Sequence, residues 1–299
     1  MNELVKRIIV AFVGIPLALL IMYLGGYPFL VTVAIISSIA LWEFYKIAEK
    51  KHAFPNKFPG ILAGLVLMSL FYYRNTFFDF VWLLIFLTLF IIIVFSLELF
   101  RNKPNGFLNV STTIAGVIYI SASFCCLIGL REFYKLIDSP IFANDITGIN
   151  RSFIISTFTK SIFCCWLVAN IFISVWVSDS AAYFIGVKFG KHRLFPRISP
   201  KKSWEGAVAG FIFAIIGFSV SSALLIPKFP IMHAIIIGAI IGVIGQVGDL
   251  AESLLKRDAG IKDSSGIIPG HGGVLDRFDS ILFVAPAVYI YLLVLLFVG

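Results

Sequence analysis

VWLLIFLTLFIIIVFSL, residues 81–97, contains no charged side chain and is one of several long apolar stretches in this chain. About 20 apolar residues in a helix cross a hydrocarbon core that is roughly 30 Å thick. Of the 299 residues, 60% are hydrophobic and only 13% are charged, whereas soluble domains contain about 25% charged residues. The composition therefore predicts an all-α, polytopic integral membrane protein.

The apolar runs are separated by short polar segments along the whole chain. They predict about nine transmembrane helices, at residues 8–24, 28–46, 59–73, 77–97, 110–130, 161–178, 206–226, 231–250 and 281–298. Lys6 and Arg7 precede the first helix, and most later cations fall in loops on the same side, so the N-terminus is expected in the cytoplasm. The connection at residues 131–160 also carries Lys and Arg, which argues against this orientation.

Chemistry-bearing residues are unevenly distributed. We expect N-terminal transmembrane helices at residues 1–105, middle helices at 106–177, and a catalytic region with a cytoplasm-facing polar site at 178–299. The four cysteines form two adjacent pairs inside apolar runs, without the spacing of a zinc site or a disulfide framework. The net charge of +8 lies in short loops, so its expected partners are lipid headgroups and anionic substrates, with no nucleic acid.

A polar helical face is predicted at the end of the eighth span. Asp249, Glu252, Ser253 and Lys256 recur at three- and four-residue spacing and so project from one side of a helix. A charge inside a transmembrane segment costs at least about 2.5 kcal/mol, which favours a functional role, pairing or a wet cavity. The alternative is a structural salt bridge from Asp249 or Glu252 to Lys256 or Arg257.

The segment KDSSGIIPGHGG, residues 262–273, cannot form a regular helix, and its backbone N–H groups could hold phosphate oxygens. A plain turn between helices needs the same residues. Asp276 and Asp279 follow at a spacing that lets both carboxylates face one way and hold Mg²⁺. Capping of a helix N-terminus by acidic residues is the alternative for this pair.

A second polar cluster comprises VSDSAAYFIGVKFGKHR, residues 177–193, and SPKKSWEG, residues 199–206. Lys201, Lys202 and Ser203 directly precede the seventh span, where cations and hydroxyls are well placed for anionic oxygens. The positive-inside rule alone would also place lysines there. The P-loop, H-E-x-x-H and G-x-S-x-G motifs are absent from the sequence, so a P-loop ATPase, a zincin and an elbow-type serine hydrolase lose support.

SLLKRDAGIKDSSGIIPGHGGVLDRFD, residues 253–279, closely resembles the signature of phosphatidate cytidylyltransferases, the CDP-diacylglycerol synthases. Segments 179–183 and 199–206 also look like that family, whereas residues 1–160 are similar mainly in hydropathy and number of spans. The resemblance implies that phosphatidate and CTP give CDP-diacylglycerol and pyrophosphate in phospholipid biosynthesis. It also implies a divalent metal, Mg²⁺, with room for a second ion.

The resemblance implies roles for individual residues. Metal ligands would be Asp249 and Asp276, supported by Asp279 and Asp179, with Glu252 behind them. The triphosphate would be neutralised by Lys256, Arg257, Lys262 and Arg277, and His271 would hydrogen-bond a phosphate or water. The lipid or nucleotide phosphates would contact Lys201, Lys202 and Ser203, and the further substrate-binding positions are Ser253, Gly272 and Gly273.

The expected surroundings follow from the same resemblance: a bacterial inner membrane, membrane lipid as a contact, and a homodimer as an open option.

Two other enzyme or transport functions remain as alternatives. A CTP-dependent lipid or polyprenol kinase would release CDP instead of pyrophosphate. An ion-coupled secondary transporter would use intramembrane carboxylates, although the paired broken-helix repeats of such proteins are not found. A non-catalytic lipid-binding scaffold would leave the carboxylates unexplained.

Overall fold

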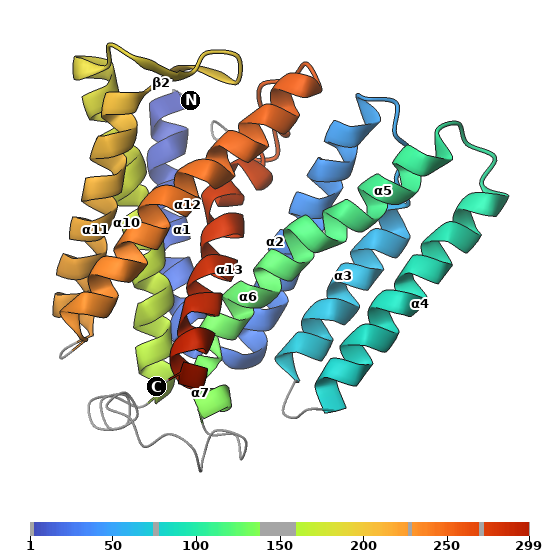
Figure 1. Cartoon of the computed structure of the whole chain (residues 1–299), viewed down its shortest axis with the longest axis horizontal. Helices are drawn as coiled ribbons and strands as arrows, with labels where there is room; N and C mark the ends of the chain where they lie inside the picture. The colour runs from blue at the N-terminus through green and yellow to red at the C-terminus, as the bar shows by residue number, and fades with distance from the viewer. Residues whose placement is uncertain (1–2, 74–77, 138–159, 227–228, 269–271, 299) are drawn as a thin grey trace. The chain divides into compact units, whose positions relative to one another are not determined.

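The computed structural model describes residues 3–73, 78–137, 160–226, 229–268 and 272–298. Most of these residues are helical (Figure 1), which confirms the all-α prediction. The chain divides into two compact units, and each combines segments that are distant in sequence. Unit 1 consists of Met1–Gly129 and Leu255–Phe278, and unit 2 consists of Leu130–Leu254 and Asp279–Gly299.

The membrane prediction is confirmed by helix length and composition. Seven helices within the described ranges are long and apolar enough to cross a membrane. The other two predicted spans fall on shorter apolar stretches, Phe12–Leu24 within the helix Glu3–Leu24 and the helix Lys57–Tyr72, so the count of nine and the cytoplasmic N-terminus stay predictions. Large apolar side chains on these helices face outward, as Ile92 and Phe95 do with 54% and 56% exposure. Such a surface requires lipid to cover it.

Unit 1 is built from the N-terminal helices, and α2, α3, α4 and α5 lie beside one another in it (Figure 1). Its elements are α1 (Glu3–Leu24), α2 (Gly26–Glu49), α3 (Lys57–Tyr72), α4 (Phe78–Phe100), α5 (Gly106–Gly116), the π-helical turn η1 (Val117–Ser121) and most of α6 (Ala122–Arg131). The end of α12 (Ile231–Asp258) and the first turn of α13 (Leu275–Val298) complete it.

A buried tyrosine fixes the position of α2 within unit 1. The Tyr45 hydroxyl donates to the carbonyl oxygen of Thr113 at 2.9 Å. Its ring lies against Gly116, where an added Cβ would approach a ring carbon to 2.6 Å. A glycine is therefore required at this contact between α2 and α5, and the contact holds the neighbouring residues of α2 in place.

Unit 2 contains α7 (Phe133–Ile137), α10 (Lys160–Phe189), α11 (Trp204–Leu225) and most of α12 and α13. Close packing of α10 on α11 is secured by two serines, because Ser174 and Ser178 donate to carbonyl oxygens of α11 at 2.8 and 3.0 Å. Gly238 of α12 lies against α11, where an added Cβ would come within 2.6 Å of a backbone carbon. Close approach of helices at small residues is typical of packing between membrane helices.

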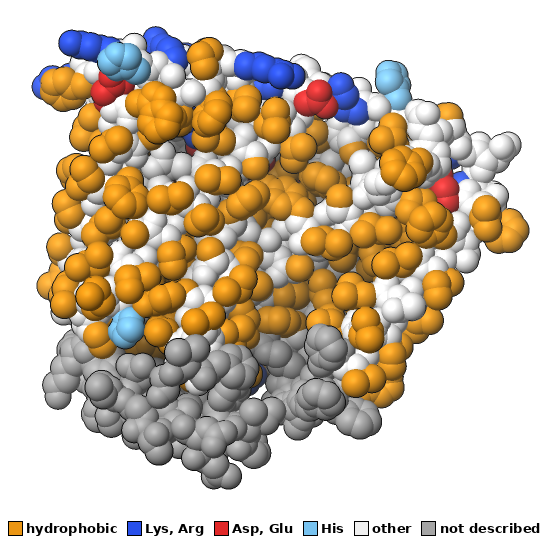
Figure 2. Space-filling model, in the orientation of Figure 1, with side chains coloured by type: hydrophobic (Ala, Val, Ile, Leu, Met, Phe, Trp, Pro, Cys, Tyr) orange, Lys and Arg blue, Asp and Glu red, His pale blue; other side chains and the backbone are white. Residues whose placement is uncertain are grey.

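A two-stranded hairpin interrupts the helices of unit 2. β1 (Arg193–Phe195) pairs with β2 (Ser199–Ser203) in antiparallel register, with Arg193 opposite Ser203. The sequence did not predict these strands, because they are short, rich in cations and lack an alternating apolar pattern. Figure 2 shows Lys and Arg side chains gathered at the hairpin end of this unit, while apolar side chains cover the flanks of its helices.

Two helices continue beyond their apolar runs. α10 extends to Phe189, beyond the predicted span that ends at residue 178, and α12 extends to Asp258, which confirms the helical face predicted from Asp249 to Lys256. An apolar run ends where polar side chains begin. The helix can continue beyond it, because residues such as Ala, Glu, Leu and Lys are good helix formers and continue the backbone hydrogen bonding. Asp179 and Asp249 consequently lie inside regular helices.

Candidate active site

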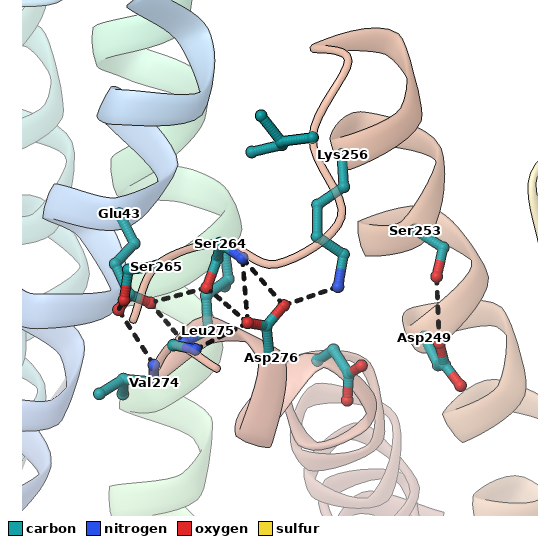
Figure 3. Close-up of polar contacts among 12 residues, drawn as sticks. Glu43, Asp249, Ser253, Lys256, Ser264, Ser265, Val274, Leu275 and Asp276 are labelled. Atoms are coloured by element: carbon teal, nitrogen blue, oxygen red, sulfur yellow. Dashed lines mark hydrogen bonds and ion pairs between the residues drawn. The ribbon is translucent and has the colours of Figure 1, made fainter. Parts of the chain in front are cut away.

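The first polar cluster lies in unit 2 and is centred on Asp249 of α12. Asp249 Oδ2 accepts a hydrogen bond from Lys202 Nζ at 2.6 Å, which is also an ion pair. Ser253, one turn further along α12, donates from its hydroxyl to Asp249 Oδ1 at 3.3 Å (Figure 3). The two charged side chains are about one-third exposed, at 30% for Lys202 and 32% for Asp249. We call these three residues the Asp249 cluster.

The hairpin positions the lysine of this cluster. β2 ends at Ser203, whose extended backbone makes it the N-cap of α11, and its hydroxyl accepts from the Gly206 N–H at 3.2 Å. Such a cap satisfies one of the first N–H groups of the helix. Lys202 directly precedes the cap and reaches Asp249, whereas Lys201 is exposed on the neighbouring position of the strand. The sequence placed both lysines at a helix start, and the structure brings one of them to the leading carboxylate.

The second polar cluster lies in unit 1 and is centred on Asp276, in the first turn of α13. Asp276 Oδ1 forms a 2.6 Å ion pair with Lys256 Nζ. Asp276 Oδ2 accepts from the Ser264 N–H at 3.0 Å, the Ser264 hydroxyl at 2.9 Å and the Gly273 N–H at 2.7 Å. The contact back to Gly273 is the kind made in a capping box. Both charged side chains are nearly buried, at 11% and 6% exposure.

Glu43 was missed by the sequence analysis and belongs to the Asp276 cluster, together with Lys256, Ser264, Ser265 and Gly273. Its side chain is completely buried in α2. It accepts from the Ser264 and Ser265 hydroxyls and from the N–H groups of Val274 and Leu275 (Figure 3). The available signal was a carboxylate inside an otherwise apolar predicted span, where charge is expensive and usually functional or paired.

The backbone of the Gly-rich segment faces these carboxylates where it is described. The N–H groups of Ser264, Gly273, Val274 and Leu275 all donate to Asp276 or Glu43. The N–H of Ile268 donates to the carbonyl of Gly272, a residue with a φ of +80°. These amides are therefore engaged within the protein, while His271 lies outside the described residues.

The remaining predicted site residues occupy several positions. Asp279 lies three residues beyond Asp276 on α13, and its Oδ1 accepts from the N–H of Ser280 at 2.6 Å. An added Cβ on Gly248 would lie 2.6 Å from the carbonyl oxygen of Asp279, so α12 and α13 approach closely beside Asp249. Glu252 is buried on α12, and the other residues are exposed: Asp179, Arg257, Lys262 and Arg277.

The donor chemistry of both clusters suits a hard cation. Carboxylate oxygens are the protein ligands that Mg²⁺ prefers, and Asp249 is partly exposed and already holds an ammonium group. Among the residues that the structure describes, no three His, Cys, Asp or Glu side chains are grouped closely enough to hold a metal as they stand. Asp249 and Asp276 are each neutralised by lysine instead. A metal at Asp249 would need Lys202 to move away, which its partial exposure permits.

Comparison with known proteins points to one family. A family model described as "Cytidylyltransferase family" matches residues 5–295. A phosphatidate cytidylyltransferase of Bacillus subtilis is 30% identical over 301 residues, which cover 98% of this chain and 98% of the relative. One of Synechocystis is 33% identical over 298 residues, covering 97% of each chain. One of Haemophilus influenzae is 46% identical over 135 residues, covering 44% of this chain and 47% of the relative.

Proposed function

Starting from the fact that this chain belongs to the cytidylyltransferase family, we propose that it is a phosphatidate cytidylyltransferase of phospholipid biosynthesis. Its substrates would be CTP and phosphatidate, and its products CDP-diacylglycerol and pyrophosphate. The observation that carries the proposal is the similarity to the Bacillus subtilis phosphatidate cytidylyltransferase over 98% of both chains. The placement of cations and carboxylates on transmembrane helices supports it, since both substrates are polyanions and one is a lipid.

The proposed reaction is a displacement at phosphorus. An ionised phosphate oxygen of phosphatidate would form a bond to the α-phosphorus of CTP, and the bond between that phosphorus and the oxygen leading to the β-phosphorus would break. The electron pair leaves with pyrophosphate. Because the nucleophile is already ionised, no general base is required, and the protein has to align two polyanions and offset their charge.

Lys202 and Lys256 are the cations best supported for this task. Each is held within 2.6 Å of a carboxylate, so its ammonium group is already positioned before substrate binds. Lys202 is 30% exposed and could exchange its carboxylate for a phosphate oxygen, whereas Lys256 is 11% exposed and is held more firmly. The exposed Lys201, Arg257, Lys262 and Arg277 would add positive charge for the triphosphate and the departing pyrophosphate.

We include Mg²⁺ in the proposal, with the ligands that the sequence indicated: Asp249, supported by Asp279 and Asp179, within unit 2, and Asp276 within unit 1. When bound, the ion would offset the charge of the triphosphate. Asp249 has the most suitable surroundings for this role, because it is partly exposed and Gly248 brings the backbone of Asp279 close to its helix. The protein's own contribution would be to hold Asp249 and Asp276 in place through their ion pairs with Lys202 and Lys256.

The seven apolar helices and the bacterial relatives support a place in a bacterial inner membrane, where phosphatidate is available from the bilayer.

The position of a phosphorus label tests the reaction itself. Purified protein would be incubated with phosphatidate and CTP labelled at either the α- or the γ-phosphorus. We expect only the α-label to enter the lipid fraction. Entry of the γ-label with release of CDP would instead establish a lipid kinase.

A further inference from the structure

We propose that Glu43 of α2 is a positioning residue that holds the segment from Ser264 to Leu275 and, through Ser264, sets the Asp276 carboxylate. This inference deepens the proposed function and rests on it. Glu43 lies more than 200 positions away in the sequence, since its contact with Ser265 is separated by 222 residues. Every residue in the argument belongs to unit 1.

The contacts of Glu43 bind both ends of this segment. At the start, the hydroxyl of Ser264 donates to Glu43 Oε2 at 3.1 Å, and the Ser265 hydroxyl donates to Oε1. At the end, the N–H of Val274 donates to Oε1 at 3.1 Å and the N–H of Leu275 donates to Oε2 at 2.7 Å. One carboxylate therefore ties the two ends of the loop to each other and to α2 (Figure 3).

The groups around Glu43 suit a carboxylate acceptor. Two N–H groups and the Ser265 hydroxyl donate to it, and the Ser264 hydroxyl, whose single hydrogen it shares with Asp276, lies at 3.1 Å. The two N–H groups lie at the N-terminus of α13, where the helix dipole favours negative charge. A carboxylate buried in a membrane helix is costly to desolvate, but donors directed at both of its oxygens offset that cost.

The backbone at Gly273 leaves room for the carboxylate. An added Cβ on Gly273 would lie 2.7 Å from each Glu43 oxygen and would collide with the Ser264 hydroxyl oxygen. Only glycine leaves room for Glu43 to reach the backbone at this point. The next two N–H groups along the chain are the ones that it binds.

Ser264 transmits the position of Glu43 to the proposed reaction centre. Its hydroxyl oxygen lies 3.1 Å from Glu43 Oε2 and 2.9 Å from Asp276 Oδ2, so it contacts both carboxylates. Asp276 in turn holds Lys256 at 2.6 Å. Displacing Glu43 would shift Ser264 and loosen Asp276 and Lys256, although Glu43 itself would touch no substrate. Supporting residues of this kind typically change activity by about 10- to 100-fold when mutated.

The test compares Glu43→Gln with Glu98→Gln in the full-length protein. Glutamine keeps the shape of the Glu43 side chain, but an NH₂ group replaces one of the accepting oxygens and faces the donors. Glu98 is a matched control, because it is a 10% exposed carboxylate of unit 1 that accepts from Asn109 and Arg101, away from the loop. Three quantities would be measured: thermal unfolding in detergent, pyrophosphate release, and hydrogen–deuterium exchange of residues 264–276 without metal or nucleotide.

We expect Glu43→Gln to exchange faster in residues 264–276 and to lose about 10- to 100-fold in kcat, with Glu98→Gln unchanged in both. Adding Ser264→Ala to Glu43→Gln should cause little further loss, because the two residues act in one path. The proposal would be overturned if the Glu43→Gln variant had the exchange rate and kcat of the wild type. It would also be overturned if the kcat losses of Glu43→Gln and Ser264→Ala were fully additive in the double variant. If Glu43→Gln does not fold, Ser265→Ala removes one donor and must still speed exchange, or the proposal fails.

The exchange measurement is independent of catalysis. Wild-type protein that releases no pyrophosphate would overturn the proposed function, and with it the catalytic consequence of Glu43. Faster loop exchange in the Glu43→Gln variant would then still establish that the carboxylate holds the segment. The two failures are therefore distinguishable.

Discussion

Replacing Asp276 by asparagine should destabilise the protein and abolish its activity. A second substitution should restore the stability without restoring the activity. The substitution keeps the side-chain shape but removes the charge that faces Lys256 at 2.6 Å. Since the two side chains are only 11% and 6% exposed, the remaining ammonium would be a buried charge without this counter-ion. Removing one member of a buried pair costs about 3–5 kcal/mol. The melting temperature of the protein in detergent should therefore fall by several degrees.

The double variant Asp276→Asn with Lys256→Met separates stability from catalysis. Methionine removes the buried charge and fills a similar volume, so most of the lost stability should return. Activity should not return, because both the carboxylate and the cation are absent from the proposed site. Pyrophosphate release and unfolding would be measured on the same preparations. Recovery of activity together with stability would refute the catalytic role of this pair, and an unchanged melting temperature in Asp276→Asn would refute its structural role.

Three further substitutions, one of them with a matched control, give clear expectations. Gly273→Ala should reduce pyrophosphate release at least about tenfold, since its Cβ would lie 2.7 Å from the oxygens of Glu43, whereas Gly266→Ala, with nothing within 4 Å, should behave as wild type. Gly238→Ala should lower stability by about 1–3 kcal/mol in thermal unfolding, because its Cβ meets the backbone of α11; an unchanged melting temperature would contradict that contact. Lys202→Met should change stability by no more than about 1 kcal/mol but abolish activity, and an active variant would remove this lysine from the mechanism.

Much of the architecture could be predicted from the sequence because hydropathy records contact with lipid directly. The apolar runs gave the helices of both units. The end of α10 could not be placed, since a helix continues through polar residues that good helix formers surround. The hairpin was missed because its cation-rich strands lack alternation.

The site was predictable in part for similar reasons. Helical spacing correctly put Asp249 and Ser253 on one face, and local sequence suggested that Asp276 could cap a helix. The ion pair of Lys202 with Asp249 joins residues 47 positions apart, which spacing within one segment cannot reveal. Glu43 required the same kind of long-range knowledge, although its charge within an apolar run was a usable signal. Its role depends on donors from a loop more than 200 positions away.

Pyrophosphate release by the purified full-length protein with CTP, Mg²⁺ and phosphatidate is the most direct test of the central claim. The wild-type protein should release pyrophosphate only when both phosphatidate and CTP are present, and diacylglycerol should not replace phosphatidate. Asp249→Asn should abolish this release while the Glu98→Gln control retains it. Absence of release from folded wild-type protein, or full release from Asp249→Asn, would contradict the account.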